Sequence, residues 1–324
     1  MISVWRLRHF PYSGATMYLG ILAGLTTCAL WGLTFVAPRA VMPFSAYDLA
    51  AARYGVFGLT CILLMLNRRF RPTGLSLRLW IIGILLGSVG YAGYFLLISF
   101  AVKDAGAVIP PLITGLMPVL LPIIANLREN ALPWRALSLP LGLIVIGLIV
   151  ANASTLLHDD AAGSSVVTGA LWATAALVVW ISYGIGNAAI MRRPDAPDAL
   201  HWTGIQGVGS ALSAVLLMPT LSYGLFSTAP SGEVVNFAIW SICMGLAASW
   251  VATWCWVYAA KHVPLSLTSQ LIIAETVFGV AFGLIYEGRL PTFTEGLGAI
   301  LQVLGVAMAV YAFGRGQRVE VAAL

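Results

Sequence analysis

The sequence predicts an all-α integral membrane protein with ten transmembrane helices, arranged as two inverted five-helix repeats. The composition, the apolar stretches and an internal repeat support this fold class. Of the 324 residues, 60% are hydrophobic and 9% are charged, whereas a soluble protein carries about 25% charged residues because its surface must be hydrated. The mean hydropathy of +0.92 indicates a surface that is solvated by lipid. The net charge of +5 therefore does not indicate nucleic-acid binding.

Ten apolar stretches are long enough to cross a bilayer. A spanning helix needs roughly 20 apolar residues and a barrel strand only about 10, so these lengths exclude a membrane barrel. The predicted spans are 17–37, 47–66, 79–101, 105–127, 135–153, 167–190, 199–219, 235–259, 264–286 and 293–314. The first span is too long for the core of a signal peptide, so we expect it to be part of the folded protein.

The spans divide the chain into two repeats and leave only short connectors. We expect a cytoplasmic segment over 1–16, a first repeat over 17–153, a periplasmic linker over 154–166, a second repeat over 167–314 and a cytoplasmic tail over 315–324. These lengths leave no room for a separate soluble domain.

The basic residues predict the orientation. With a cytoplasmic N-terminus, the inner side collects Arg6, Arg8, Arg68, Arg69, Arg71, Arg78, Arg128, Arg135, Arg192, Arg193, Lys261, Arg315 and Arg318. The outer side keeps Arg39, Lys103 and Arg289. Basic residues favour the inner side of a membrane, which is negative. We therefore expect both termini to be cytoplasmic, in a bacterial inner membrane.

An internal repeat relates the two halves. Residues 87–147 align without a gap onto 245–305, and Trp31 of the first span matches Trp180 of the sixth with a slightly different offset. Five spans are an odd number, so the second copy must enter the membrane from the opposite side. Inverted repeats of this kind are common in secondary transporters. The alternative is a duplication that serves stability only.

Several short motifs resemble a known family. They are Ala-Leu-Trp-Gly over 29–32, Met-Pro-Val over 117–119, and a Glu followed by Leu-Pro at Glu129 and again at Glu287. In this order they resemble the drug/metabolite transporter superfamily, in its branch with two EamA domains. The resemblance implies export of amino acids, or carriage of nucleotide sugars, sugar phosphates or other metabolites. Where members often have Glu-Pro-Val in the ninth span, this chain has Glu-Thr-Val from Glu275.

Charged side chains inside a membrane are costly and usually mark a cavity or a partner. Glu275 lies about halfway along the ninth span, and Arg53 about two turns into the second. Glu275 could bind a cationic or zwitterionic substrate or carry a coupling proton, and Gln270 lies nearby on the same span. The alternatives are a structural glutamate held by neighbouring hydroxyl groups, and an arginine that extends to the interface or pairs with Asp48.

Aromatic side chains at helical spacing are candidate walls for a substrate with an apolar body, although ordinary packing explains each of them as well. The candidates are Trp31, Trp180, Tyr91, Tyr94, Trp250 and Trp254. Prolines such as Pro118 predict a bent or opened fourth span. Glu129 and Glu287, at opposite membrane faces and each near an arginine, are expected to form structural pairs or gates.

Secondary transport of a small metabolite is the leading hypothesis, with amino-acid export as the best estimate and a coupling proton left open. Passive facilitation through a channel and uptake of another metabolite are the alternatives. We expect no enzyme, because the spans show neither a nucleophile with a base nor a carboxylate–histidine cluster on facing helices. We also expect no cofactor, no metal and no nucleic-acid partner. Lipid and the substrate are the expected partners, and the oligomeric state is open.

Overall fold

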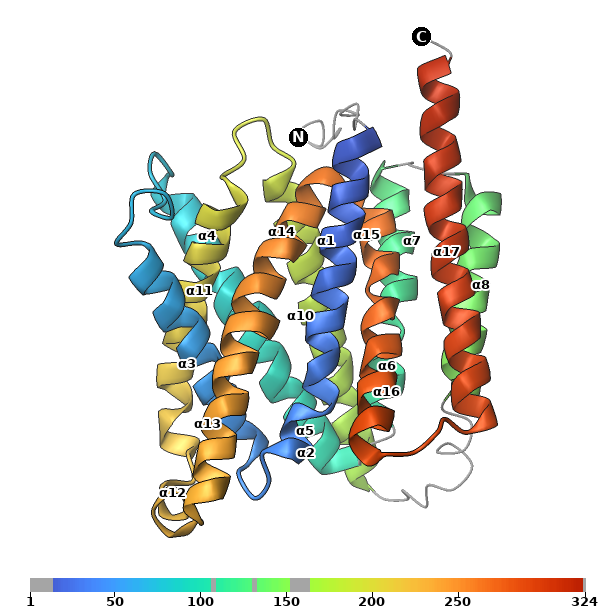
Figure 1. Cartoon of the computed structure of the whole chain (residues 1–324). Coiled ribbons are helices and arrows are strands. Elements are labelled where there is room, and N and C mark those ends of the chain that lie inside the picture. The colour runs from blue at the N-terminus through green and yellow to red at the C-terminus, as the bar shows by residue number, and fades with distance from the viewer. Residues whose placement is uncertain (1–13, 106–108, 130–132, 152–163, 323–324) are drawn as a thin grey trace.

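The protein is a helical bundle. The computed structural model describes residues 14–105, 109–129, 133–151 and 164–322, and every regular element in these ranges is a helix (Figure 1). Among the described residues, eight helices are long and apolar enough to cross a membrane. They are Ala15–Ala40, Ala46–Leu64, Leu77–Ala101, Trp134–Ala151, Val167–Met191, Ser231–His262, Leu267–Glu287 and Phe293–Ala312.

The predicted spans 105–127 and 199–219 are not among these eight. The first is divided into helices α6 and α7, and part of it lies outside the described residues. The second forms one helix, α11, but its side chains include Thr203, Gln206 and Ser210, all fully buried. Because α11 faces protein over much of its surface, it tolerates polar residues that a lipid-facing helix would not.

The first half of the chain contains five predicted spans, and the helices have the following bounds. They are α1 (Gly14–Gly32), η1 (Leu33–Phe35), α2 (Ala37–Ala40), α3 (Ala46–Leu64), α4 (Leu77–Gly87), η2 (Ser88–Gly93), α5 (Tyr94–Ala105), α6 (Ile109–Thr114), α7 (Met117–Glu129) and α8 (Trp134–Ala151). The element η2 is a π-helical turn that joins α4 to α5.

The second half has a similar order of elements. They are α10 (Ser164–Met191), α11 (Ala199–Leu217), η3 (Met218–Thr220), α12 (Tyr223–Thr228), α13 (Ser231–Gly245), η4 (Leu246–Val251), α14 (Ala252–His262), α15 (Leu265–Leu271), α16 (Ile273–Glu287) and α17 (Phe293–Ala322). The last helix continues past residue 314, where we expected the tail to begin. The expected linker 154–166 and segment 1–16 lie largely outside the described residues.

Side chains near the helix ends explain where several helices start. Ser45 accepts a hydrogen bond from the Asp48 backbone N–H, while Asp48 accepts one from the Ser45 backbone, so α3 begins with a capping box. Asp48 also accepts a bond of 2.8 Å from the Ser222 backbone N–H, which ties α3 to the second half. Asp198 caps α11 in a similar way. These caps satisfy N–H groups that have no partner within the helix.

Two pairs of consecutive helices are separated by short breaks. The predicted break in the fourth span is present between α6 and α7. A second break, between α15 and α16, occurs at Ile272 although no proline follows Glu275. The Leu271 carbonyl beside this break accepts a hydrogen bond of 3.2 Å from the Cys28 thiol. A carbonyl released by a break therefore finds its partner on α1.

Equivalent elements recur at a constant separation. The π-helical turns η2 and η4 lie 158 residues apart (88–93 against 246–251), as do the ends of α7 at Glu129 and α16 at Glu287. This separation equals the offset of the sequence repeat between 87–147 and 245–305. The repeat is therefore accompanied by matching π-helical turns, which the sequence alone did not predict.

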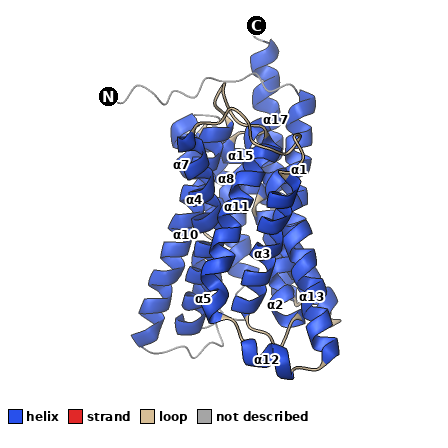
Figure 2. Cartoon of the chain, turned by 90° about the vertical axis from the view of Figure 1, so that its left-hand side faces the viewer, coloured by secondary structure: helices blue, strands red, loops and turns tan. Residues whose placement is uncertain are grey.

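The two halves are packed into each other. Helix α3 packs against α11, α8 against α17, and α7 against α15. Helix α1 packs against α14 and α16, while α10 packs against α5 and α6. Helix α1 begins and α17 ends at the same end of the bundle (Figure 1). Figure 2 shows α12 at the opposite end.

Candidate functional site

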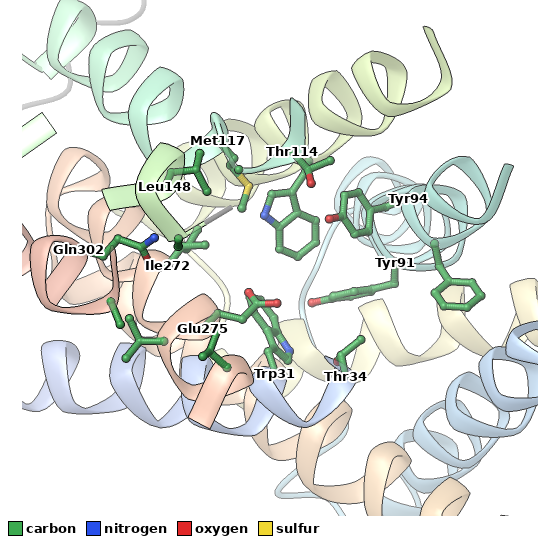
Figure 3. A pocket seen from close by; sticks show the side chains of 18 of the residues that line it. Trp31, Thr34, Tyr91, Tyr94, Thr114, Met117, Leu148, Ile272, Glu275 and Gln302 are labelled. Carbon is green, nitrogen blue, oxygen red and sulfur yellow. The ribbon is translucent and has the colours of Figure 1, made fainter. Parts of the chain in front are cut away.

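A cavity of about 410 Å³ lies in the centre of the bundle and is lined by helices of both halves. Its walls include Trp31, Thr34, Arg53, Tyr54, Tyr91, Tyr94, Thr114, Met117, Trp180, Glu275 and Gln302. Figure 3 shows the labelled members of this set around the open space. The lining also includes Ala151, the last residue of α8, and Glu295, near the start of α17, and these two helix ends lie at the lower end of the bundle in Figure 1. The cavity therefore extends from mid-membrane towards that end.

Glu275 lies in the first turn of α16, directly after the break at Ile272. Its carboxylate points into the cavity beside Trp31 (Figure 3). Among the described residues, nothing donates a hydrogen bond to this carboxylate or pairs with it as a salt bridge. Arg53 and Tyr94 act on it only through longer-range electrostatics. A carboxylate without a partner at this depth is costly, so it is available to a ligand.

Aromatic rings surround this carboxylate. Trp31 and Trp180 meet edge to face with ring centroids 5.3 Å apart, and Tyr94 lies 5.2 Å from Trp180. Tyr94 also shares a side-chain hydrogen bond with Thr114. The faces of such rings carry negative electrostatic potential and attract cations. The cavity thus combines a carboxylate with aromatic faces, which suits an organic cation or an amine.

Arg53 lines the same cavity from α3 and is 8% exposed. Its Nε donates to Ser249 Oγ at 2.8 Å, and its Nη2 donates to the Ala248 carbonyl at 2.9 Å. Its Nη1 donates to Thr34 Oγ1 at 3.2 Å. These partners are neutral, and Asp48 is used in capping α3 instead of pairing with Arg53. Among the described residues, no carboxylate therefore pairs with this guanidinium at the cavity wall.

Six of the predicted site residues lie together around this cavity, and three do not. Trp31, Arg53, Tyr91, Tyr94, Trp180 and Glu275 line it. Gln270 is fully buried on α15, before the helix break. Trp250 packs beside the core and Trp254 is 36% exposed. The turn η4 ends at Val251, between these two tryptophans, so α-helical spacing did not apply to them.

The predicted pairs at the helix ends are partly visible. Glu287 accepts a hydrogen bond of 2.6 Å from Arg289 and also forms an ion pair with Arg39. Arg289 in turn bonds Glu295 at 2.8 Å, at the lower end of the cavity. Glu129 and Pro118 lie in α7, but their side chains lie outside the described part of the structure. A gating role for these residues stays a prediction.

Sequence reasoning missed several lining residues, among them Thr34, Thr114 and Met117. Met117 precedes Glu275 by 158 residues, so the repeat offset places the two at equivalent positions. This offset could have identified Met117 once Glu275 was chosen. In the described ranges, no group of three or more His, Cys, Asp or Glu side chains could hold a metal ion.

Comparison with known proteins agrees with this architecture. Residues 18–153 match the family described as EamA-like transporter family. Inner membrane protein YtfF of Escherichia coli (strain K12) is 27% identical over 308 residues, covering 91% of this chain and 96% of its own. Uncharacterized transporter YoaV of Bacillus subtilis (strain 168) is 24% identical over 305 residues, covering 91% of this chain and 98% of its own.

A crystal structure of a protein with 18% sequence identity has the same fold. It superposes with a TM-score of 0.71 and covers 91% of this chain and 98% of its own. The family match falls on the first half, and the relatives extend over both halves. Residues 18–153 therefore match the EamA-like transporter family, and the chain is a multi-pass membrane protein that resembles inner membrane and transporter relatives over most of its length.

Proposed function

We propose that the protein is a secondary transporter that exports a small metabolite with an amino group, an amino acid or a related compound, across the bacterial inner membrane. One observation carries the proposal. The Glu275 carboxylate faces a central cavity with no protein partner among the described residues, between aromatic rings contributed by both halves. The names of the relatives YtfF, an inner membrane protein, and YoaV, a transporter, support the location and the general role.

The proposal includes ten spans in two inverted repeats. Beyond the eight apolar helices, α6 with α7 would form the fourth span and α11 the seventh. Supporting this, several packed pairs of helices recur when the halves are exchanged. The pair α1 and α14 becomes α10 and α5, and the pair α11 and α4 becomes α3 and α13. Exchange of the two halves' conformations would then convert an outward-facing state into an inward-facing one.

The distribution of basic residues supports cytoplasmic termini. Arg68, Arg69, Arg71, Arg78, Arg135, Arg192, Arg193 and Lys261 lie in or beside helix ends at the upper end of the bundle in Figure 1, where α1 begins. Basic residues favour the cytoplasmic side. The cavity extends towards the opposite end, so this conformation would be the outward-facing one.

In this mechanism Glu275 accepts the positive charge that is to be moved. The amino group of a substrate would bind the carboxylate while its apolar body contacts Trp31 and Trp180. A proton could occupy the same carboxylate when the substrate has left, and this would couple the two flows. Substrate binding and proton binding would both depend on the Glu275 carboxylate. In apolar surroundings this carboxylate would either bind a positively charged group or be protonated.

The test compares metabolites inside and outside cells that express the parent protein, Glu275→Gln or Glu233→Gln. Glu233 lies in the first turn of α13, away from the cavity lining, and serves as the matched control. We expect one compound to accumulate in the medium of cells that express the parent or Glu233→Gln. Cells that express Glu275→Gln should accumulate much less of this compound in the medium. Equal amounts of the three proteins in the membrane are required for the comparison.

If Glu275→Gln exports as the parent does, Glu275 does not carry the substrate or the proton. Once the compound is known, flux into inside-out vesicles separates coupled transport from passive facilitation. Coupled transport accumulates the compound above the external concentration, and an ionophore that abolishes the proton gradient removes this accumulation. Flux that stops at equal concentrations contradicts coupling.

A further inference from the structure

Two groups of three polar side chains lie beside the central cavity, one in each direction along the bundle. The first, called here the Arg53 triad, consists of Arg53 with Thr34 and Ser249, the two hydroxyl groups to which its guanidinium donates. Arg53 and Thr34 both line the cavity. Ser249 belongs to the π-helical turn η4.

The second group, called here the Gln206 triad, consists of Gln206, Tyr183 and Tyr91. The Tyr183 hydroxyl donates to Gln206 Oε1 at 2.9 Å, and the Tyr91 and Tyr183 hydroxyls lie 2.7 Å apart. Tyr91 belongs to the π-helical turn η2 and lines the cavity. Gln206 and Tyr183 are fully or almost fully buried behind it.

The two triads correspond residue by residue under the repeat. Thr34 and Tyr183 each lie three residues after the matched tryptophans Trp31 and Trp180. Arg53 and Gln206 each lie eight residues after the N-caps of α3 and α11, which are both 19 residues long. Ser249 and Tyr91 occupy the fourth position of the two π-helical turns. Each triad therefore joins the same three elements, taken from opposite halves.

Close backbone approaches repeat the same correspondence. Gly87 and Gly245 directly precede the two π-helical turns. A Cβ atom on Gly87 would lie 2.0 Å from the Gln206 backbone oxygen, and one on Gly245 would lie 3.0 Å from the Arg53 backbone oxygen. Each turn is thus pressed against the helix that carries the polar residue of its triad.

The triads differ in their exposure. Arg53 and Thr34 of the first triad line the open cavity, whereas Gln206 is fully buried and does not line it. Gln206 lies in the first half of α11, which starts at the upper end of the bundle in Figure 1. From Gln206 the polar contacts continue to Asn187, whose Oδ1 accepts bonds from Gln206 Nε2 at 3.1 Å and from Trp202 Nε1 at 2.8 Å. The indole N–H can only donate, so the orientation of the Asn187 amide is fixed.

Asn187 is fully buried, and its Nδ2 has no hydrogen-bond partner in the part of the chain that the structure describes. A buried donor without an acceptor lowers the stability of the fold. Such a donor is typically matched by a bound water or by a ligand group. Asn187 Nδ2 therefore indicates a place for a hydrogen-bond acceptor behind the Gln206 triad.

We propose that Gln206 and Asn187 line the inward-facing form of the transport route, as the counterpart of Arg53 in the outward-facing form. The neutral side-chain amides of Gln206 and Asn187 would donate hydrogen bonds to a carboxylate or carbonyl oxygen of the substrate. Hydrogen bonds from a charged guanidinium are roughly twice as strong as neutral ones, so the acceptor group is held less tightly on the cytoplasmic side. This inference rests on the proposed function, because it requires the two halves to exchange conformations.

The test measures the accessibility of single introduced cysteines in the full-length protein, without the need for a known substrate. A membrane-impermeant maleimide is applied to right-side-out and to inside-out vesicles, and labelled peptides are identified by mass. We expect Gln206→Cys to react in inside-out vesicles and Arg53→Cys to react in right-side-out vesicles. Ile205→Cys, on the same helix and equally buried, is the matched control and should react at least about tenfold more slowly than Gln206→Cys.

Asn187→Cys provides a second position that leaves the Gln206 triad in place, in case Gln206→Cys does not reach the membrane. The same preference for inside-out vesicles is expected there. The proposal is overturned if neither position reacts faster than Ile205→Cys from the cytoplasmic side, or if Ile205→Cys reacts equally fast. Labelling at Gln206 together with normal transport by Glu275→Gln would refute the proposed role of Glu275 and leave this inference standing.

Discussion

At the scale of single residues, the central feature is a carboxylate and a guanidinium that share one cavity without pairing. Arg53 has neutral partners, and Glu275 has none among the described residues. A direct ion pair would neutralise both groups and leave nothing for a ligand. Arg53 stays apart from Glu275 because its guanidinium donates hydrogen bonds to Ser249 and Thr34 on its own side of the cavity. Under the proposed function, the carboxylate and the guanidinium would bind the two ends of a zwitterion.

The aromatic wall gives a prediction at this scale. Trp31→Leu should raise the substrate concentration needed for half-maximal transport by about tenfold, since a cation–π contact in a dry site contributes about 1 to 2 kcal/mol. Trp31→Phe should change it less, because it keeps a ring face beside Glu275. The measurement is transport of the identified compound in inside-out vesicles.

Trp254→Leu is the control for the loss of an indole, since Trp254 does not line the cavity. It should leave the half-maximal concentration unchanged. An equal effect of Trp31→Leu and Trp31→Phe would mean that the indole contributes shape or hydrogen bonding and not its ring face.

At the scale of elements, interruptions of the helices place the site residues. The break at Ile272 puts Glu275 in the first turn of a new helix, and the turn η2 carries Tyr91 to the cavity. A π-helical turn inserts one residue and changes which face of the helix the following residues occupy. Regular helices would have placed these side chains elsewhere, as the case of Trp254 illustrates.

Helix α8 packs closely on α17 through glycines, which gives a prediction about stability. A Cβ atom on Gly147 would lie 2.8 Å from Gln302 Cγ and from the Gly298 carbonyl oxygen. Gly147→Val should therefore force the helices apart and lower stability by about 1 to 3 kcal/mol. The measurement is the temperature of thermal unfolding of the purified protein in detergent.

Gly142→Val, on the same helix, is the matched control because a Cβ atom there meets nothing within 4 Å. It should leave the unfolding temperature close to that of the parent. A similar loss for both variants would point to a general effect of valine in α8 and not to the contact with α17.

At the scale of the whole molecule, two interlocked halves leave the site between them and not within either one. Trp31 and Trp180 approach the centre from α1 and α10, and Met117 and Glu275 approach it from α7 and α16. Under the proposed function, a movement of one half against the other would change access to the cavity. Neither half would form the cavity by itself.

Topology provides the prediction at this scale. A reporter that is active only in the cytoplasm should be active when fused after Leu324 or inserted between α10 and α11. A reporter that is active only in the periplasm should be active when inserted beside α12. Activity of the periplasmic reporter at the C-terminus would reverse the orientation and make the present conformation inward-facing.

Much of this architecture follows from the sequence alone. Apolar length predicts where helices cross the membrane, because an unpaired backbone group in hydrocarbon costs several kcal/mol and helices satisfy these groups locally. The rarity of charges singled out Glu275 and Arg53, which both line the cavity. The gapless alignment of 87–147 with 245–305 predicted the repeated order of elements.

Tertiary structure decided the rest. Which polar residues meet across the bundle depends on contacts between elements far apart in the chain, such as Arg53 with Ser249 and Tyr91 with Gln206. Because of the π-helical turns, Tyr91 lines the cavity and Trp254 does not. Sequence periodicity describes one helix at a time, whereas a cavity is defined by how several interrupted helices pack, and that packing exists only in the folded molecule.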